Sequence, residues 1–536
     1  MDTKVKIVFL GGTVANGEDD NLTKSCTLIQ VHTGKKRSNI LVDCGLWQGR
    51  KEFFAKHNSE FPFNPAIIDA VVITHSHLDH VGRIPILVRK GFGKGGRNGR
   101  FFSTSSTRDI AEIMLYDTEK LSALEVRKFH KRKKEKPPIS GRRWNKLLEK
   151  RLLEMGEEKR DQFLEEIREI ERNKKPEGWE VKIFDKADIS ESMRLFKCHE
   201  YETPFFKLTN GVRAKFYPPG HVLGGAISVI EIDRKVQGID QPIRIGFSGD
   251  LGRRDGIILP APKTIQEPLD YWVTESTYGT INHPKRSSDL ERLLKAVHWC
   301  VNRKGKILIP SFALERAQEL IYLLSLHMDK SSIPNIPIYL DSPMAAKITE
   351  VYADKWYSPM FKGQNDLGYN PFDVWENKHF RTVETNEESK RLTFRKGPAI
   401  IIAGSGMGDG GRIRSHFKMG GLSDPKNLIC IVGYSVIGTT VRAIADRESE
   451  ITIDNIIIPN KARMEKFGSF SAHADQEFLT HYTKEIIRKS PGLKKIFINH
   501  GGYTNGHGFR EHLIHSLPRD WEERIAIPDA GDEFVL

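Results

Sequence analysis

One segment of the chain, residues 74–82, reads THSHLDHVG and places four potential metal ligands within six residues. These ligands are His75, His77, Asp79 and His80. The segment follows the apolar, β-branched stretch AVVI, which is typical of a buried strand. Imidazole and carboxylate groups suit zinc, and a carboxylate between two ions suits a dinuclear site. The pattern therefore predicts a metal centre in a compact loop at a strand end, in preference to a chance group of solvated side chains.

This motif resembles the metallo-β-lactamase superfamily, whose fold is an αββα sandwich that holds one or two metal ions. Later segments match the same family in order and spacing: Asp43 in LVDCG, His221 in PGHVLGG and Asp250 in SGDLG. The resemblance implies that one zinc ion is held by His75, His77 and His221. It implies that Asp79 and His80 hold a second ion, with Asp250 bridging the two. Asp43 would orient ligand histidines through hydrogen bonds. Asp79 is expected to be essential for catalysis as well as a ligand.

Three segments near the middle and end of the chain resemble the motifs of the β-CASP branch of that superfamily, whose members are nucleases. They are TESTYG at 274–279, SFSAHAD at 469–475 and INHG at 498–501. The resemblance assigns His500 as the remaining ligand of the second zinc. It makes His473 the general acid that protonates the leaving 3′ oxygen, and Glu275 the carboxylate that orients it. Imidazole titrates near neutrality, which suits that role.

Both of these last residues have simpler interpretations that the sequence leaves open. The alternative for Glu275 is an ordinary carboxylate that forms a salt bridge. His473 stands among residues that favour helix N-termini, such as Ser469, Ser471 and Asp475.

A glycine-rich loop, GSGMGDGGR at 404–412, follows a predicted buried strand and precedes a predicted helix. Backbone amides at such a position can bind phosphate, and a hydroxyl and a guanidinium can add contacts. The candidate RNA phosphate-binding residues are Ser405, Gly406, Gly410, Gly411 and Arg412. A tight structural turn is the alternative.

The elements that must position these residues fall into three stretches. Residues 1–278 contain short strands ending in polar or glycine residues, and the resemblance predicts most of the αββα sandwich there. Residues 279–449 alternate helices with buried strands, which predicts a parallel sheet with flanking helices, inserted as a β-CASP cap. Residues 450–536 return to complete the sandwich. The expected class is α/β.

Residues 119–176 differ from the rest, since they hold 19 Lys and Arg against 12 Asp and Glu, with leucines and isoleucines near helical spacing. They predict a basic helical insertion. It either binds nucleic acid or is a solvated helix pair with no binding role.

The composition excludes several other classes. The 536 residues carry a net charge of +13, which favours a polyanionic partner such as nucleic acid, although solubility alone would also account for it. The five cysteines are scattered and form no CxxC pair, which argues against a disulfide scaffold, a zinc ribbon and an iron–sulfur cluster. No apolar run is long enough to cross a membrane, and no signal peptide is evident, so we expect a cytoplasmic protein.

Taken together, the motifs predict a zinc-dependent ribonuclease similar to the pre-mRNA 3′-end processing nuclease and its archaeal and bacterial relatives. Histidine at position 500 favours RNA within this family. Two Zn²⁺ ions would generate hydroxide from water at neutral pH; Mn²⁺ or Fe²⁺ are alternatives. Endonucleolytic and 5′–3′ exonucleolytic modes both stay open, as do assembly into a homodimer or an RNA-processing complex. The alternatives are a DNA or defence nuclease with the same core, and a partner-activated RNA-binding subunit.

Overall fold

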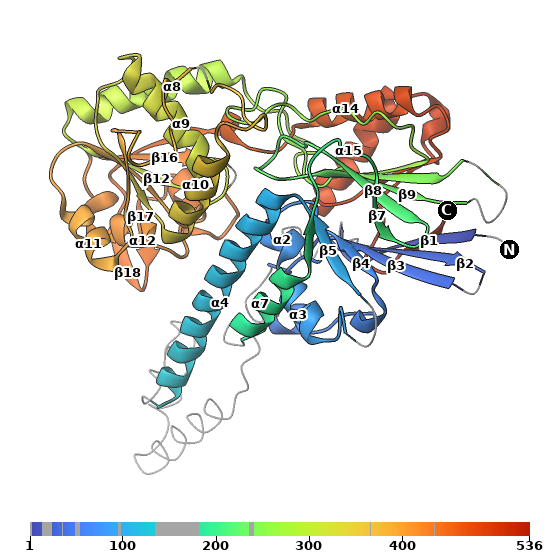
Figure 1. Ribbon diagram of the computed structural model, residues 1–536. Helices are drawn as coiled ribbons and strands as arrows, with labels where there is room; N and C mark the ends of the chain where they lie inside the picture. Colours follow the sequence, from blue (N-terminus) through green and yellow to red (C-terminus); the bar gives the residue numbers. More distant parts are fainter. Residues whose placement is uncertain are drawn as a thin grey trace, which may run out of the picture.

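The computed structural model describes residues 3–12, 24–34, 36–48, 54–94, 98–134, 182–234, 239, 241–364, 366–433 and 435–536. Most of the predicted basic insertion lies outside these residues. Its first part, 119–134, belongs to the long helix α4 (Ser105–Lys134), which extends away from the body of the protein (Figure 1).

Two seven-stranded sheets lie face to face. The first has the order β22-β1-β2-β3-β4-β5-β6 and the second the order β21-β20-β11-β10-β9-β8-β7. The strands of the first sheet are β1 (Thr3–Phe9), β2 (Thr27–Thr33), β3 (Lys36–Val42), β4 (Ala70–Val72), β5 (Arg100–Ser103), β6 (Phe196–Cys198) and β22 (Glu533–Val535). Those of the second are β7 (Phe206–Thr209), β8 (Val212–Tyr217), β9 (Ile227–Ile232), β10 (Ile243–Phe247), β11 (Tyr271–Thr274), β20 (Lys495–Ile498) and β21 (Ile525–Ala526).

The alternation of side chains along the strands explains this packing. In β8, Val212, Ala214 and Phe216 point to one face and pack between the two sheets, against residues such as Ile7 and Ile29 of the first sheet. The outer faces of both sheets are apolar as well, so each must be covered by helices.

Helices α1 (Phe54–Asn58), α2 (Leu78–Val81), α3 (Ile84–Arg89), α4 and α7 (Lys186–Arg194) cover the first sheet, and α14 (Gln476–Lys489) and α15 (Tyr503–Ser516) cover the second. The predicted αββα sandwich is confirmed.

The inserted cap is built on a third sheet, with the order β14-β13-β15-β12-β16-β19 and every pairing parallel. Its central strands are buried on both faces, as the runs AIIIA and LICIV require. The strands are β12 (Lys306–Pro310), β13 (Ile338–Asp341), β14 (Phe380–Thr382), β15 (Ala399–Ala403), β16 (Leu428–Val432) and β19 (Arg463–Phe467). The accompanying helices are α8 (Arg286–Asn302), α9 (Arg316–Asp329), α10 (Pro343–Lys355), α11 (Asn386–Phe394), α12 (Ile413–His416) and α13 (Thr440–Ala445).

The cap sheet continues past residue 449, at which the sequence analysis placed its end. A hairpin of β17 (Glu450–Ile453) and β18 (Ile456–Pro459) follows, and β19 then pairs with β16 in parallel. We therefore propose that the cap extends to Phe467, with the chain returning to the sandwich after it.

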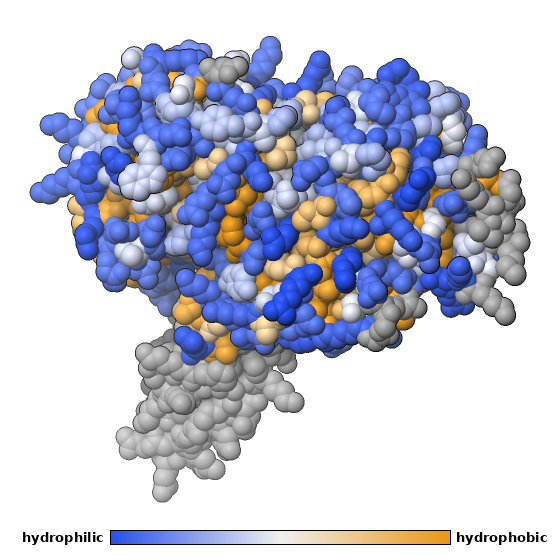
Figure 2. Space-filling model, in the orientation of Figure 1, coloured by the Kyte–Doolittle hydropathy of each residue, from blue (hydrophilic) through white to orange (hydrophobic). Residues whose placement is uncertain are grey.

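The cap is joined to the sandwich by a shared apolar cluster. Helix α10 packs on α4, and residues of the cap core such as Leu314 pack with Ile110 of α4 and with Val222 and Leu223 of the β8–β9 loop. Figure 2 shows apolar residues in the middle of this face, between the cap and the sandwich, with hydrophilic residues covering both bodies. Among the described residues, no helix is long and apolar enough to cross a membrane.

Candidate metal centre

The HxHxDH segment forms the connection from β4 to α2. His75 follows the buried strand, His77 is the N-cap residue of α2, and Asp79 and His80 lie on its first turn. Because the chain changes from extended to helical within these few residues, successive side chains turn toward one point instead of alternating between two faces. The structure therefore places these side chains in a loop at a strand end, and their binding of a metal remains a prediction.

A first cluster of possible ligands contains His75, His77, His221 and Asp250, whose ligand atoms lie within 4.8 Å of one another. His77 Nδ1 is 3.0 Å from His75 Nε2 and 3.4 Å from His221 Nε2. Asp250 Oδ2 is 3.4 Å from His75 Nε2 and 3.5 Å from His221 Nε2. His221 comes from the loop between β8 and β9, and Asp250 follows β10.

A second cluster contains Asp79, His80 and His500. His500 Nε2 lies 3.0 Å from His80 Nε2 and 3.4 Å from Asp79 Oδ2. The other oxygen of Asp250, Oδ1, is 3.3 Å from His80 Nε2 and 3.1 Å from His500 Nδ1. Asp250 therefore faces both clusters, one oxygen to each.

The backbone around Asp250 is shaped for this central position. Gly249 adopts φ 55°, and a side chain there would meet Thr74 and the Ala226 carbonyl, so glycine suits the turn that follows β10. His500 has φ 49°, a left-handed conformation that is uncommon for a residue with a side chain.

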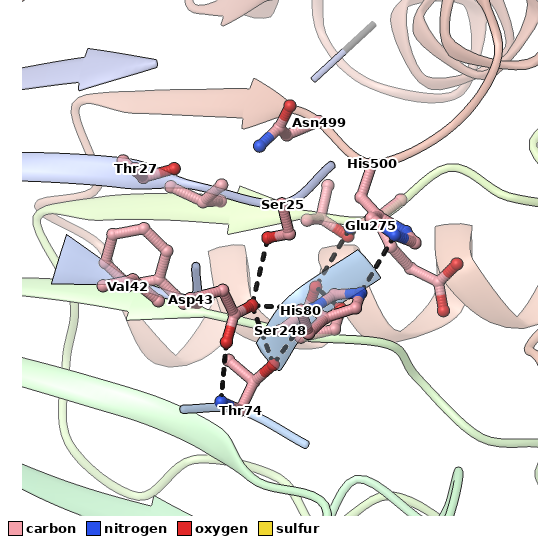
Figure 3. Close-up of a pocket in the computed structure, with 14 residues that line it drawn as sticks. Ser25, Thr27, Val42, Asp43, Thr74, His80, Ser248, Glu275, Asn499 and His500 are labelled. Atoms are coloured by element: carbon pink, nitrogen blue, oxygen red, sulfur yellow. Dashed lines mark hydrogen bonds and ion pairs between the residues drawn. The ribbon is translucent and has the colours of Figure 1, made fainter. Parts of the chain in front are cut away.

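Asp43 lies behind the second cluster and holds it in place (Figure 3). Its Oδ2 lies 2.7 Å from His80 Nδ1, which leaves His80 Nε2 directed at the cluster. Ser25 and Thr74 donate their hydroxyls to the same oxygen, and the Thr74 amide donates to Oδ1. Among the described cluster members, Asp43 thus contacts His80 alone, and an orienting role for Asp43 remains a prediction.

The charge states of the first cluster match a set of metal ligands. Burial lowers the pKa of His77 to about 3 and that of His221 well below its usual value, which favours neutral imidazoles. Burial alone would raise the pKa of Asp79 and Asp250, but contacting histidines outweigh it and keep both carboxylates ionised. Neutral imidazole and ionised carboxylate are the forms in which these side chains bind metal ions. In the second cluster, burial alone would lower the pKa of His80 and His500, but Asp250 outweighs it and raises both.

The clusters also contain buried polar atoms that have no hydrogen-bond partner in the described part of the protein, as expected of metal ligands. Asp250 Oδ1 and His500 Nδ1 are buried close together, yet neither makes a hydrogen bond within the described residues. A buried carboxylate oxygen that accepts no hydrogen bond is costly, and a cation between these groups would satisfy it. The residues present therefore fit a metal centre, and the figure of two ions remains a prediction.

His473 and Glu275 form a separate pair at the edge of the first cluster. His473 Nδ1 lies 3.4 Å from Glu275 Oε2, and its ring lies against that of His221 with 4.3 Å between centroids. The Glu275 carboxylate is held by the amides of Leu251 and Thr277. Burial alone would lower the pKa of His473, but Glu275 and then Asp250 outweigh it and raise that pKa above its usual value. The raised pKa favours the protonated imidazole, which is the form that a general acid requires.

Replacing Glu275 by glutamine should shift the pH dependence of cleavage. If His473 donates a proton, the rate falls as pH rises through its pKa. Removing the carboxylate charge lowers that pKa, so we expect the alkaline decline of kcat to move to lower pH. The measurement is a pH–rate profile of Glu275→Gln, with Glu231→Gln as the control variant. Glu231 is a buried carboxylate of β9 that pairs with Arg213 and Arg244. An alkaline limb that stays in place in Glu275→Gln would contradict the pairing.

The glycine-rich loop lies in the cap, between β15 and the short helix α12. The guanidinium of Arg412, however, already donates to Asp341, to the carbonyls of Val383 and Glu384, and to Asn386. These bonds tie the loop to neighbouring cap elements and leave Arg412 little capacity for phosphate. A phosphate-binding role for Ser405, Gly406, Gly410 and Gly411 stays a prediction.

The sequence analysis did not single out Ser25, Thr74, Ser248 or His283. Ser25 and Thr74 position Asp43, Ser248 accepts the Glu275 amide, and His283 Nε2 lies 3.1 Å from the His473 carbonyl oxygen. Thr74 and Ser248 carried a signal, since Thr74 directly precedes His75 and Ser248 opens the SGDLG motif that contains Asp250. Ser25 and His283 stand in segments without a pattern, and only folding reveals their partners.

Comparison with known proteins identifies the family of this chain. The metallo-beta-lactamase superfamily matches residues 20–98, and the Beta-Casp domain matches residues 317–444. Ribonuclease TTHA0252 of Thermus thermophilus is 30% identical over 464 residues, covering 86% of this chain and 87% of that protein. The chain belongs to the β-CASP branch of the metallo-β-lactamase superfamily. The resemblance inferred from the motifs is thereby confirmed.

Other relatives include one of similar length and one that is much longer. An RNase J-like protein of Methanocaldococcus jannaschii is 27% identical, with 91% of each chain covered. Cleavage and polyadenylation specificity factor subunit 3 of Dictyostelium discoideum is 28% identical over 88% of this chain, which spans about half, 51%, of that longer protein.

Proposed function

We propose that this protein is a metal-dependent ribonuclease that hydrolyses phosphodiester bonds in RNA processing or decay. The observation that carries the proposal is the position of Asp250, which faces two clusters of ligands at once, with the His473–Glu275 pair beside them. Two metal ions supply Lewis-acid stabilisation of phosphoryl oxygens and a water acidic enough to serve as nucleophile near neutral pH. Zinc suits the imidazole and carboxylate donors.

The chain's own residues then account for the rest of the reaction. Asp43 fixes the orientation of His80, and Asp250 orders both clusters. Glu275 faces Nδ1 of His473, which leaves Nε2 as the atom that delivers a proton to the departing 3′ oxygen. Products with 5′-phosphate and 3′-hydroxyl ends would result from that assignment.

RNA is the proposed substrate because relatives that cover nearly all of this chain are named as ribonuclease and RNase J-like protein. The net charge of +13 supports a polyanionic partner. The cap loop with Ser405 and its glycines is the proposed contact for a backbone phosphate.

The test is cleavage of RNA and DNA strands of matched sequence, labelled separately at each end, with zinc per chain counted in the same sample. We expect metal-dependent cutting of RNA that is lost in Asp79→Asn, since Asp79 is a ligand of the second cluster. Cutting confined to DNA, or an Asp79→Asn variant as active as the wild type, would contradict the proposal. The pattern of end labels distinguishes internal cuts from stepwise removal at the 5′ end.

A further inference from the structure

A strained residue of the cap lies next to the metal centre. Glu315, just before α9, is 3% exposed and has φ 64° and ψ −56°. The Arg316 amide donates to the Leu314 carbonyl at 2.8 Å, which closes a classic γ-turn around Glu315. This turn is rare and strained for a residue with a side chain, and such strain persists only where the surrounding structure enforces it.

The carboxyl of Glu315 reaches out of the cap toward the loop that carries His221. Tyr352 of α10 donates its hydroxyl to Glu315 Oε2 at 2.5 Å, and the Leu223 amide donates to the Tyr352 hydroxyl at 3.3 Å. Leu223 stands two residues after His221, and Glu315 and His221 line one small cavity between the cap and the sandwich.

This loop has no regular secondary structure of its own, so its position depends on such contacts. From the sandwich, Thr104 and Thr107 donate their hydroxyls to the Gly224 carbonyl. From the cap, the Tyr352 hydroxyl accepts a hydrogen bond from the neighbouring Leu223 amide. The segment that follows His221 is therefore held from two sides, and one of them is the cap.

The first cluster alone is coupled to the cap in this way. Within the described residues, Asp79, His80 and His500 make hydrogen bonds only to residues of the sandwich, including Asp43, Thr74 and Ser276. Loosening the Glu315–Tyr352 contact should therefore affect His221 and leave the second cluster in place.

We propose that Glu315 and Tyr352 are positioning residues through which the cap fixes His221, so that metal affinity at the first cluster depends on the cap. The proposal rests on the proposed zinc-dependent function, since it concerns how that centre is assembled. Burial and the neighbouring Glu319 raise the pKa of Glu315 well above its usual value, so that its neutral form is favoured. A glutamine amide should therefore replace it without loss.

The principal test compares zinc affinity in Tyr352→Phe and wild type by competition with a chelator. We expect one of two zinc equivalents to weaken by about 10–100-fold, which is typical when a residue that orients a ligand is lost, and the other to stay unchanged. Tyr322→Phe is the matched control. Its hydroxyl is also buried in the cap but donates to Asp366, away from the loop.

Variants of Glu315 separate positioning from stability. Glu315→Gln should keep wild-type zinc affinity, because its amide oxygen still accepts the Tyr352 hydroxyl. Glu315→Gly should weaken the same zinc equivalent without lowering the Tm, because glycine adopts the left-handed turn without strain.

The outcomes distinguish this inference from the proposed function. If the wild type binds neither zinc nor Mn²⁺ or Fe²⁺, the proposed function itself is wrong. If the wild type binds two equivalents and Tyr352→Phe binds both as tightly, only the positioning role is overturned. A loss of both equivalents together with a lower Tm would also overturn it, by showing a merely structural role.

Discussion

Replacing Asp250 by asparagine should abolish cleavage and release the two metal ions that we propose for this centre. Asp250 is the one residue among the described ligands with an oxygen toward each cluster, Oδ2 toward His75 and His221 and Oδ1 toward His80 and His500. Asparagine offers one neutral oxygen and places a hydrogen-bond donor where the other stood. The loss should exceed the roughly 10–100-fold that follows when a residue merely orients a ligand.

The measurement combines zinc per chain, RNA cleavage and thermal unfolding of the same sample. Asp270→Asn is the matched control, because Asp270 accepts the Arg244 amide at the far end of β10 and contacts no ligand. An Asp250→Asn protein that retained two zinc ions, or that cut RNA at the wild-type rate, would refute the bridging arrangement.

Replacing His473 by alanine should give a nearly inactive enzyme that keeps its metal. His473 belongs to neither four-residue nor three-residue ligand cluster, so zinc binding should persist. Loss of a positioned general acid lowers the rate by about 10²–10⁴-fold. The effect should appear in kcat, and it should shrink for a phosphodiester whose leaving group is nitrophenolate, because that group departs without a proton.

The control for this variant is His298→Ala, which removes a surface histidine that contacts the Ser332 carbonyl. Equal losses on RNA and on the nitrophenyl ester would show that His473 acts by some means other than protonating the leaving group. A His473→Ala protein without zinc would instead make it a ligand.

The sequence predicted the parts of this site that are local. His75, His77, Asp79 and His80 could be recognised together because they are neighbours in the chain and follow a buried strand. The other three ligands, His221, Asp250 and His500, follow strands of the second sheet, whereas β4 belongs to the first. Hydrophobic periodicity does not predict which strand ends lie together. Only the family resemblance linked them, and the structure brings all seven together.

Features that depend on long-range contact escaped the sequence. The strand β19, RMEKF, joins the cap because it pairs with β16, about 35 residues earlier, while its own composition is that of a half-exposed edge. Arg412 has the character of a phosphate ligand, but carbonyls from a neighbouring segment occupy it. The left-handed turn at Glu315 has no signature either, since glutamate is not a residue that favours it.

Because His473 and His500 lie late in the chain, the site cannot be completed until their segments have been synthesised. Residues 3–274 can form most of both sheets, yet β20 adds to the second sheet beside β11, and only then does His500 reach Asp79. During synthesis, the earlier segments emerge and begin to fold first. A nascent chain stalled before residue 500 would therefore carry an unfinished centre, and a nuclease interrupted on the ribosome would be unable to cut the message that encodes it.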